Sequence, residues 1–134
     1  MHAILDRELV AWRANLQKEN LTDILDCPVV VAEPVGISHE WRLFIVDGRA
    51  SSGSHYRSRH RLDVSPDVPD EVIVFAEETA ATWSPAPVFV LDICQSGDQL
   101  FVLEVNCFHS SGFYAADVRK IFADVSDYVA ARRA

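Results

Sequence analysis

Residues Phe89 to Phe113 read FVLDICQSGDQLFVLEVNCFHSSGF, two apolar segments joined by a turn near Gly97. One carboxylate interrupts each segment, Asp92 in the first and Glu104 in the second, and Asn106 ends the second segment. Burying an unpaired carboxylate is costly, so each of these groups needs a partner. Two carboxylates and an amide oxygen are ligands that Mg²⁺ accepts. The pattern predicts a β-hairpin with a candidate magnesium site. The alternative is that Asp92 caps a backbone group and Glu104 pairs with an arginine.

The spacing of the two carboxylates sets a condition on this hairpin. Asp92 and Glu104 are an even number of positions apart. Side chains alternate between the faces of a sheet, and directly opposed residues share a face. The two carboxylates therefore share a face only if the connection holds an odd number of residues or one strand contains a bulge. The Ser110-Ser111-Gly112 loop that follows is predicted to open into the last helix, which is a natural place for an anion.

A second hairpin is predicted from Glu40–Val46 and Arg49–Tyr56, because Asp47-Gly48 is a strong type I′ turn signal. With regular pairing, the sheet face that packs on helices carries Trp41, Leu43, Ile45, Ala50 and Tyr56. The opposite, polar face carries Glu40, Arg42, His55 and Arg57. A solvated surface would explain this polar face equally well. The small residues Ser51 and Gly53 beside the charges, however, leave room for a ligand near the backbone.

Length and composition predict one domain over residues 1–134, in which 49% of the residues are hydrophobic. The apolar runs are too short to cross a membrane, and the net charge of −8 argues against a nucleic-acid partner. No signal peptide is expected at the start of the chain. Three cysteines, Cys27, Cys94 and Cys107, show no metal or disulfide spacing, which is typical of a reduced, cytoplasmic protein.

Hydrophobic periodicity and turn signals predict helices over residues 5–19, 70–83 and 114–131, and a short strand over 29–33. Residues 58–69 are predicted to form a loop. With the two hairpins, this order gives an α+β fold, an antiparallel sheet whose helices at 70–83 and 114–131 cover one face. The other face, with Arg42, Asp92, Glu104 and Asn106, is expected to be open to solvent or to a partner.

Several of these segments resemble the C-terminal half of an ATP-grasp domain. The resemblance rests on VVVAEPVGISHEWRLFIVDG, SGSHYR, the VLD and LEVN segments and SSGFY, and it covers roughly residues 28–128. The sequence is similar to uncharacterised phage and bacterial ATP-grasp proteins that combine an E-x-R-x-F strand with these motifs. An arginine that many ligases of this fold carry two positions before the metal aspartate is replaced here by Val90. Arg42 is its natural substitute.

The resemblance implies ATP and Mg²⁺ as cofactors. It implies that Val31, Glu33 and Val35 belong to a hinge strand that reads adenine, in a segment spanning 29–35. It further implies that Glu40 takes the ribose hydroxyls and that Asp92, Glu104 and Asn106 hold magnesium. Arg42 and Arg57 would then face the transferred phosphate or an acyl phosphate.

The function implied is the ATP- and magnesium-binding half of a carboxylate–amine ligase. In this family the nucleotide lies between two lobes, and this sequence matches only the C-terminal one. The chain is then a fragment, or a second protein or subunit supplies the other lobe, or the chemistry has been lost. Self-association is a further expectation. The alternative function is a non-catalytic nucleotide-binding, regulatory or protein-interaction module.

Overall fold

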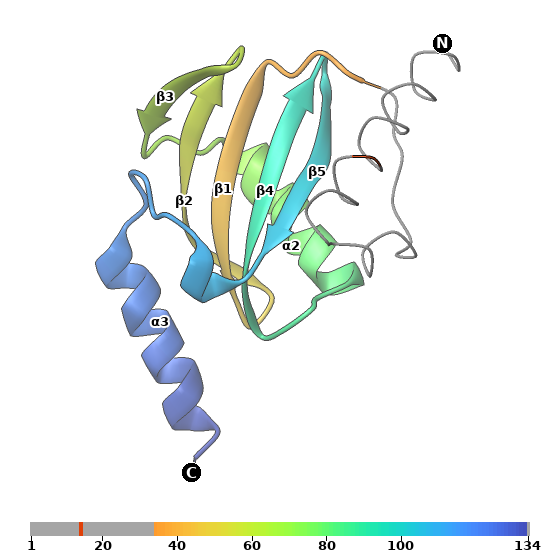
Figure 1. The fold of residues 1–134 in the computed structure, drawn as a ribbon. Helices are drawn as coiled ribbons and strands as arrows, with labels where there is room; N and C mark the ends of the chain where they lie inside the picture. Colours follow the sequence, from red (N-terminus) through yellow and green to blue (C-terminus); the bar gives the residue numbers. More distant parts are fainter. Residues whose placement is uncertain (1–13, 15–33, 134) are drawn as a thin grey trace. The chain divides into compact units, whose positions relative to one another are not determined.

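The computed structural model describes residue 14 and residues 34–133 (Figure 1). The chain divides into two compact units, Met1–Pro34 and Val35–Ala134, and the second unit contains the elements described below. The predicted helix at 5–19 and strand at 29–33 lie outside the described residues. The single-domain assignment over residues 1–134 stays a prediction.

A five-stranded antiparallel sheet forms the second unit, with the strand order β3-β2-β1-β4-β5. The strands are β1 (His39–Val46), β2 (Arg49–Ser58), β3 (Arg61–Ser65), β4 (Val88–Ser96) and β5 (Gln99–Asn106). This architecture confirms the predicted α+β class and both predicted hairpins. β3 was missed, because the segment assigned to a loop contains a short edge strand whose Leu62 and Val64 are exposed.

Helix α2 (Asp70–Thr82) covers one face of the sheet and lies behind it in Figure 1. The helix buries Val72, Ala76 and Ala80 against a core from β1 and β4 that contains Trp41, Leu43, Ile45, Phe89, Leu91 and Ile93. These strand residues alternate along β1 and β4, so they all point to the same side of the sheet. The predicted helix at 70–83 is confirmed to within one residue at its end.

Helix α3 (Val118–Ala131) packs on the opposite face, which corrects the prediction that both helices cover one face. Its Ile121 contacts a second core with Phe44 and Val90, which project away from α2. The polar face thus has an apolar end that this helix covers. α3 begins later than predicted, where Asp117 accepts a hydrogen bond from the Lys120 backbone N–H at 3.0 Å. In the described part of the chain, no helix combines the length and apolarity needed to cross a membrane.

Two β-bulges change the predicted faces of the first hairpin. The turn has positive φ at Asp47 (49°) and Gly48 (80°), as predicted, and Val46 lies opposite Arg49. Register shifts follow at Phe44/Ile45 and Glu40/Trp41, and each inserts an extra residue into β2. Consequently His55 lies opposite Trp41 on the α2 face. The hydroxyl of Tyr56 instead reaches Glu40 on the α3 face, so the predicted faces of His55 and Tyr56 are both corrected.

The space expected at Gly53 for a ligand is filled. A side chain there would lie 3.0 Å from the Arg42 carbonyl oxygen, 3.1 Å from Val68 Cγ2 and 3.2 Å from Leu43 Cγ. Gly53 therefore permits close packing of the strand against its neighbours.

Candidate functional site

Three charged side chains lie in a row across β1, β4 and β5. Arg42 is paired in register with Asp92, and Asp92 is paired with Glu104 on its other side. Directly paired residues share a face, so all three point toward the side that α3 partly covers. Asn106, which is paired with Val90, lies on that face further along β5. The structure therefore brings the three predicted metal ligands together with Arg42, and their role as ligands stays a prediction.

Asp92 and Glu104 reach the same face through a bulge. Gly97 and Asp98 alone connect the strands, since Ser96 pairs with Gln99, and this two-residue turn would separate the carboxylates. A register shift between Asp92 and Ile93 adds one residue to β5 and restores the parity. This satisfies the condition set by the sequence.

Arg42 binds Asp92 in a bidentate ion pair at the centre of the sheet. Arg42 Nε lies 2.8 Å from Oδ1 and Nη2 lies 2.7 Å from Oδ2. Asp92 is only 1% exposed. The hydrogen bond to Asp92 raises the pKa of the Arg42 guanidinium, burial opposes that rise, and the charge of Asp92 adds to it. The buried carboxylate thus finds its partner in an arginine, rather than in the backbone group considered as an alternative.

Glu104 and Asn106 differ from Asp92 in their environment. Glu104 is exposed and Asn106 is half-buried, so both can meet an incoming ion. Within residues 34–133 no group of three His, Cys, Asp or Glu side chains is arranged to hold a metal. The predicted set contains only two carboxylates, with an amide as its third donor.

Two tyrosines form an aromatic wall beside Arg42. The rings of Tyr56 and Tyr114 stack in parallel, with centroids 5.0 Å apart and an angle of 7° between their planes. The Arg42 guanidinium carbon lies 5.7 Å from the Tyr56 centroid and 5.3 Å from the Tyr114 centroid. These contacts add cation–π attraction to the ion pair and fix the guanidinium in place. Neither tyrosine was predicted as a site residue, although SSGFY was singled out as a motif.

Glu40, the predicted ribose ligand, is buried on the same face with two partners. The Tyr56 hydroxyl donates to Glu40 Oε2 at 2.7 Å, and Arg57 Nη1 lies 3.6 Å from Oε1. Burial and this hydrogen bond raise the pKa of Tyr56 above its ordinary value, so the phenol remains protonated. Arg57 is half-exposed and lies over the Tyr56 ring at 5.8 Å. Both predicted phosphate-facing arginines are therefore on this face.

The remaining predicted nucleotide contacts are only partly described. Val31 and Glu33 lie outside the described residues, and Val35 is exposed. The Ser-Ser-Gly loop does not open directly into α3. It follows the short 3₁₀ helix η2 (Phe108–Ser110).

The loop between η2 and α3 is held against the sheet by hydrogen bonds to serines of β2. The Ala115 backbone N–H donates to Ser54 Oγ at 3.2 Å, and that of Asp117 donates to Ser52 Oγ at 2.8 Å. These bonds place Tyr114, which has a positive φ of 50°, over the ion pair. Such a φ is uncommon for a tyrosine and requires support from the surrounding structure.

An α+β domain with an antiparallel sheet and this row of charges was expected of an ATP-grasp C-terminal lobe. A family model for an ATP-grasp domain, family 3 of its clade, matches residues 2–125. The chain therefore belongs to this ATP-grasp family.

Structural and sequence similarity beyond the family is limited. One similar structure is the ATP-grasp ligase PsnB complexed with a phosphomimetic variant of a minimal precursor, Mg and ADP. It has 20% identity and a TM-score of 0.45, with 66% of this chain and 32% of that chain covered. PsnB complexed with a minimal precursor gives 17%, 0.45, 69% and 36% in the same order. This chain thus spans about a third of the length of those ligase chains. No curated protein sequence matches it significantly.

Proposed function

We propose that this chain is the ATP- and magnesium-binding part of an ATP-grasp ligase that joins a carboxylate to an amine through an acyl phosphate. The observation that carries the proposal is the row Arg42–Asp92–Glu104 across three strands of an ATP-grasp family member. Membership of this family is the reason for choosing ATP and Mg²⁺ as the cofactors.

The donor chemistry on this face fits Mg²⁺. Carboxylate and amide oxygens from Asp92, Glu104 and Asn106 are the hard ligands that this ion takes alongside water and phosphate. When bound, Mg²⁺ would neutralise charge on the transferred phosphate. Arg42 already neutralises Asp92, so the protein alone offers little net negative charge. We therefore propose weak magnesium binding without nucleotide.

The remaining side chains of the face take the roles that their positions allow. Arg42 holds Asp92 and, with Arg57, presents positive charge toward phosphate oxygens. Glu40 offers its carboxylate to the ribose hydroxyls while Tyr56 holds one of its oxygens. Val31, Glu33 and Val35 are proposed to contact the adenine.

Phosphoryl transfer depends on positioning the phosphates and on excluding water from them. Glu104 is exposed on this face, so a second lobe, from another protein or subunit or from a longer chain, is proposed to close over it. The chain alone is expected to bind ATP modestly without turnover, and self-association is one way to supply the missing surface. The free thiols of Cys94 and Cys107 agree with a reducing, cytoplasmic location.

Titration calorimetry with ATP and Mg²⁺ tests the proposal. Glu104→Gln should abolish the magnesium-dependent part of ATP binding and leave the Arg42–Asp92 pair in place. Glu71→Gln, the same change at an exposed position on α2, is the matched control and should bind like the wild type. Equal magnesium-dependent affinity in wild type and Glu104→Gln would refute the assignment.

The alternative, a non-catalytic nucleotide-binding or protein-interaction module, is favoured by exposed apolar side chains. Phe101 and Leu103 on β5 and Phe122 on α3 are between 41% and 50% exposed. An ADP-release assay separates the two functions once a complementary lobe is added. Magnesium-dependent ADP production that Glu104→Gln removes would exclude the non-catalytic module.

A further inference from the structure

A histidine pair lies on the α2 face, on the other side of the sheet from the Arg42–Asp92 pair. His39 alternates with Glu40 along β1 and so points toward α2. The bulge at Glu40/Trp41 places His55 opposite Trp41 on the same side. None of the proposed ligase chemistry uses these two imidazoles.

The two rings present ring nitrogens to each other. His39 Nδ1 lies 3.2 Å from His55 Nε2. Zinc–imidazole bonds of about 2.0–2.1 Å at a tetrahedral angle separate two ligand nitrogens by roughly 3.3 Å. The observed separation is close to that value and falls at the long end of the range for a hydrogen bond. The atoms are therefore spaced as two ligands of one ion would be.

Oxygen donors lie beside the paired nitrogens. Ser58 Oγ is 3.3 Å from His39 Nδ1 and 3.4 Å from His55 Nε2. The Ser58 hydroxyl donates to Asp63 Oδ2 at 2.8 Å, and this same oxygen lies 3.9 Å from His55 Nδ1. The Asp63 side chain is 59% exposed, so it has room to change rotamer toward an ion.

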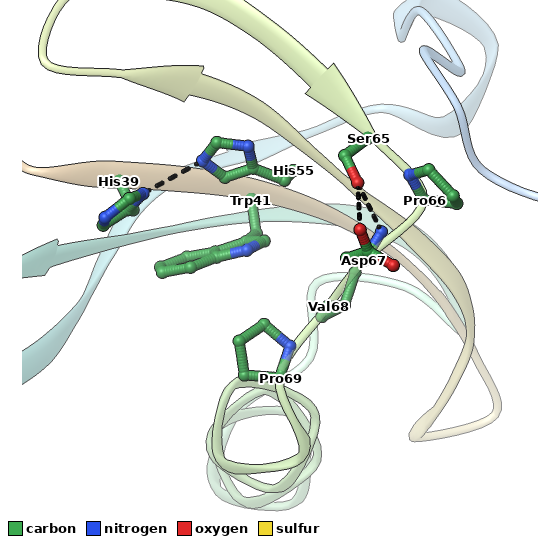
Figure 2. A pocket seen from close by; sticks show the side chains of 8 residues that line it. All are labelled: His39, Trp41, His55, Ser65, Pro66, Asp67, Val68 and Pro69. Atoms are coloured by element: carbon green, nitrogen blue, oxygen red, sulfur yellow. Dashed lines mark hydrogen bonds between the residues drawn. The ribbon is translucent and has the colours of Figure 1, made fainter.

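Trp41 fixes the orientation of both rings, as Figure 2 shows. Its centroid lies 5.6 Å from that of His39 and 5.5 Å from that of His55. Trp41 and His55 are almost fully buried, with exposed fractions of 5% and 8%. Packing that locks ligand rings before binding is what a preorganised site requires.

The pair is accessible from solvent. A groove of about 590 Å³ is lined by His39, Trp41, His55 and the segment 65–69. Figure 2 shows the Ser65–Asp67 and Pro69 side of this groove facing the rings. An ion can therefore reach the nitrogens without unfolding the sheet.

We propose that His39 Nδ1 and His55 Nε2 bind one divalent transition-metal ion, with Zn²⁺ the best match for imidazole ligands. Asp63 and water complete its coordination, because the described residues hold no preformed group of three His, Cys, Asp or Glu ligands. This site is chemically distinct from the proposed magnesium site, since imidazole nitrogen favours zinc-like ions and carboxylate oxygen favours magnesium.

Calorimetric titration with ZnCl₂ tests the proposal in a Cys107→Ser background, which removes an exposed competing thiol. We expect one Zn²⁺ per chain, and affinity at least about ten-fold weaker in His39→Gln and in His55→Gln. His60→Gln and His109→Gln change exposed histidines outside the pair and serve as matched controls with unchanged affinity. Zinc binding of equal affinity in the double variant His39→Gln/His55→Gln, or no binding at micromolar ZnCl₂, would overturn the proposal.

A second measurement needs no substitution. In the wild-type chain, imidazole ¹⁵N NMR shifts of His39 Nδ1 and His55 Nε2 should change together at one equivalent of ZnCl₂. Changes confined to His60 and His109 would show adventitious surface binding and would contradict the proposed site. Both readouts are independent of ATP, so failure of the ligase proposal leaves this test intact.

Discussion

The two faces of the sheet are built from the same strands but differ in what they bury. Beneath α2, residues such as Leu43 and Leu91 form a continuous apolar core. Beneath α3, Phe44 and Val90 form a smaller core, and the rest of the face buries Glu40 and the Arg42–Asp92 pair. Only Ile121 of α3 is fully buried, whereas α2 buries three residues. The α2 face is thus organised for stability, and the α3 face keeps charged groups in place at a cost in desolvation.

The largest expected effect is on the α3 face. Arg42→Met should destabilise the protein by about 4 kcal/mol, because it leaves Asp92 buried without its partner. Arg49→Met, which removes a largely exposed ion pair with Glu77, should cost less than about 1 kcal/mol. Urea unfolding of the three proteins measures both values. Equal costs for the two arginines would remove the distinction between buried and exposed pairs.

A cavity on the α2 face should have the next largest effect. Leu91→Ala is expected to cost about 3 kcal/mol, since this fully buried side chain leaves a void that the core fills only in part. Phe122→Ala on α3 should cost roughly 1 kcal/mol, because half of that side chain is exposed. Chemical denaturation provides the comparison. A larger loss for Phe122 would mean that α3 packs more tightly than described.

Tyr56→Phe tests the hydrogen bond that holds Glu40. Losing a buried bond to a carboxylate should cost about 2 kcal/mol. Tyr114→Phe keeps the stacked ring and changes the exposed tyrosine, so its free energy of unfolding should stay within about 0.5 kcal/mol of the wild type. If the Tyr56 and Tyr114 variants proved equally stable, Glu40 would not depend on Tyr56.

The smallest expected effect concerns Glu77, which ties α2 to β2. Its carboxylate accepts from the Ala50 backbone N–H and from Arg49, and these bonds lower its pKa. A lowered pKa in the folded state stabilises the protein above the unfolded-state value of about 4.3. That stability is lost as the pH falls through the folded-state pKa. Glu77→Gln should therefore cost less than about 1 kcal/mol at neutral pH.

Thermal unfolding across pH measures this last effect. The difference between wild type and Glu77→Gln should shrink on acidification, while Glu78→Gln, at the next position on α2, should show no such trend. A gap that stays constant with pH would indicate that packing, rather than charge, accounts for the effect.

Sequence alone predicted much of the second unit because its local signals agree with each other. Asp47-Gly48 fixed one turn, and parity between Asp92 and Glu104 required a bulge or an odd loop, which the bulge in β5 supplies. Most of the site face followed from alternation on β1 and β4, including Arg42 and Asp92.

The errors arose where tertiary packing determines register. Bulges in β2 moved His55 to the α2 face and Tyr56 to the α3 face, and no local rule of alternation reveals them. Gly53 was a usable signal, since glycine inside a strand often marks a bulge or close backbone approach. The opposite placement of α3 depends on Phe44 and Val90 forming a second core, which helical periodicity alone does not show.

The central position of the Arg42–Asp92 pair has a consequence for genetic screens. A scan that reads cellular abundance would score substitutions at these two positions as severely as those at Leu91, because destabilised chains are degraded. Exposed Glu104 would tolerate most changes in that scan. A position that keeps normal abundance but loses activity is therefore more informative about chemistry here, and among the three charges of the row only Glu104 offers it.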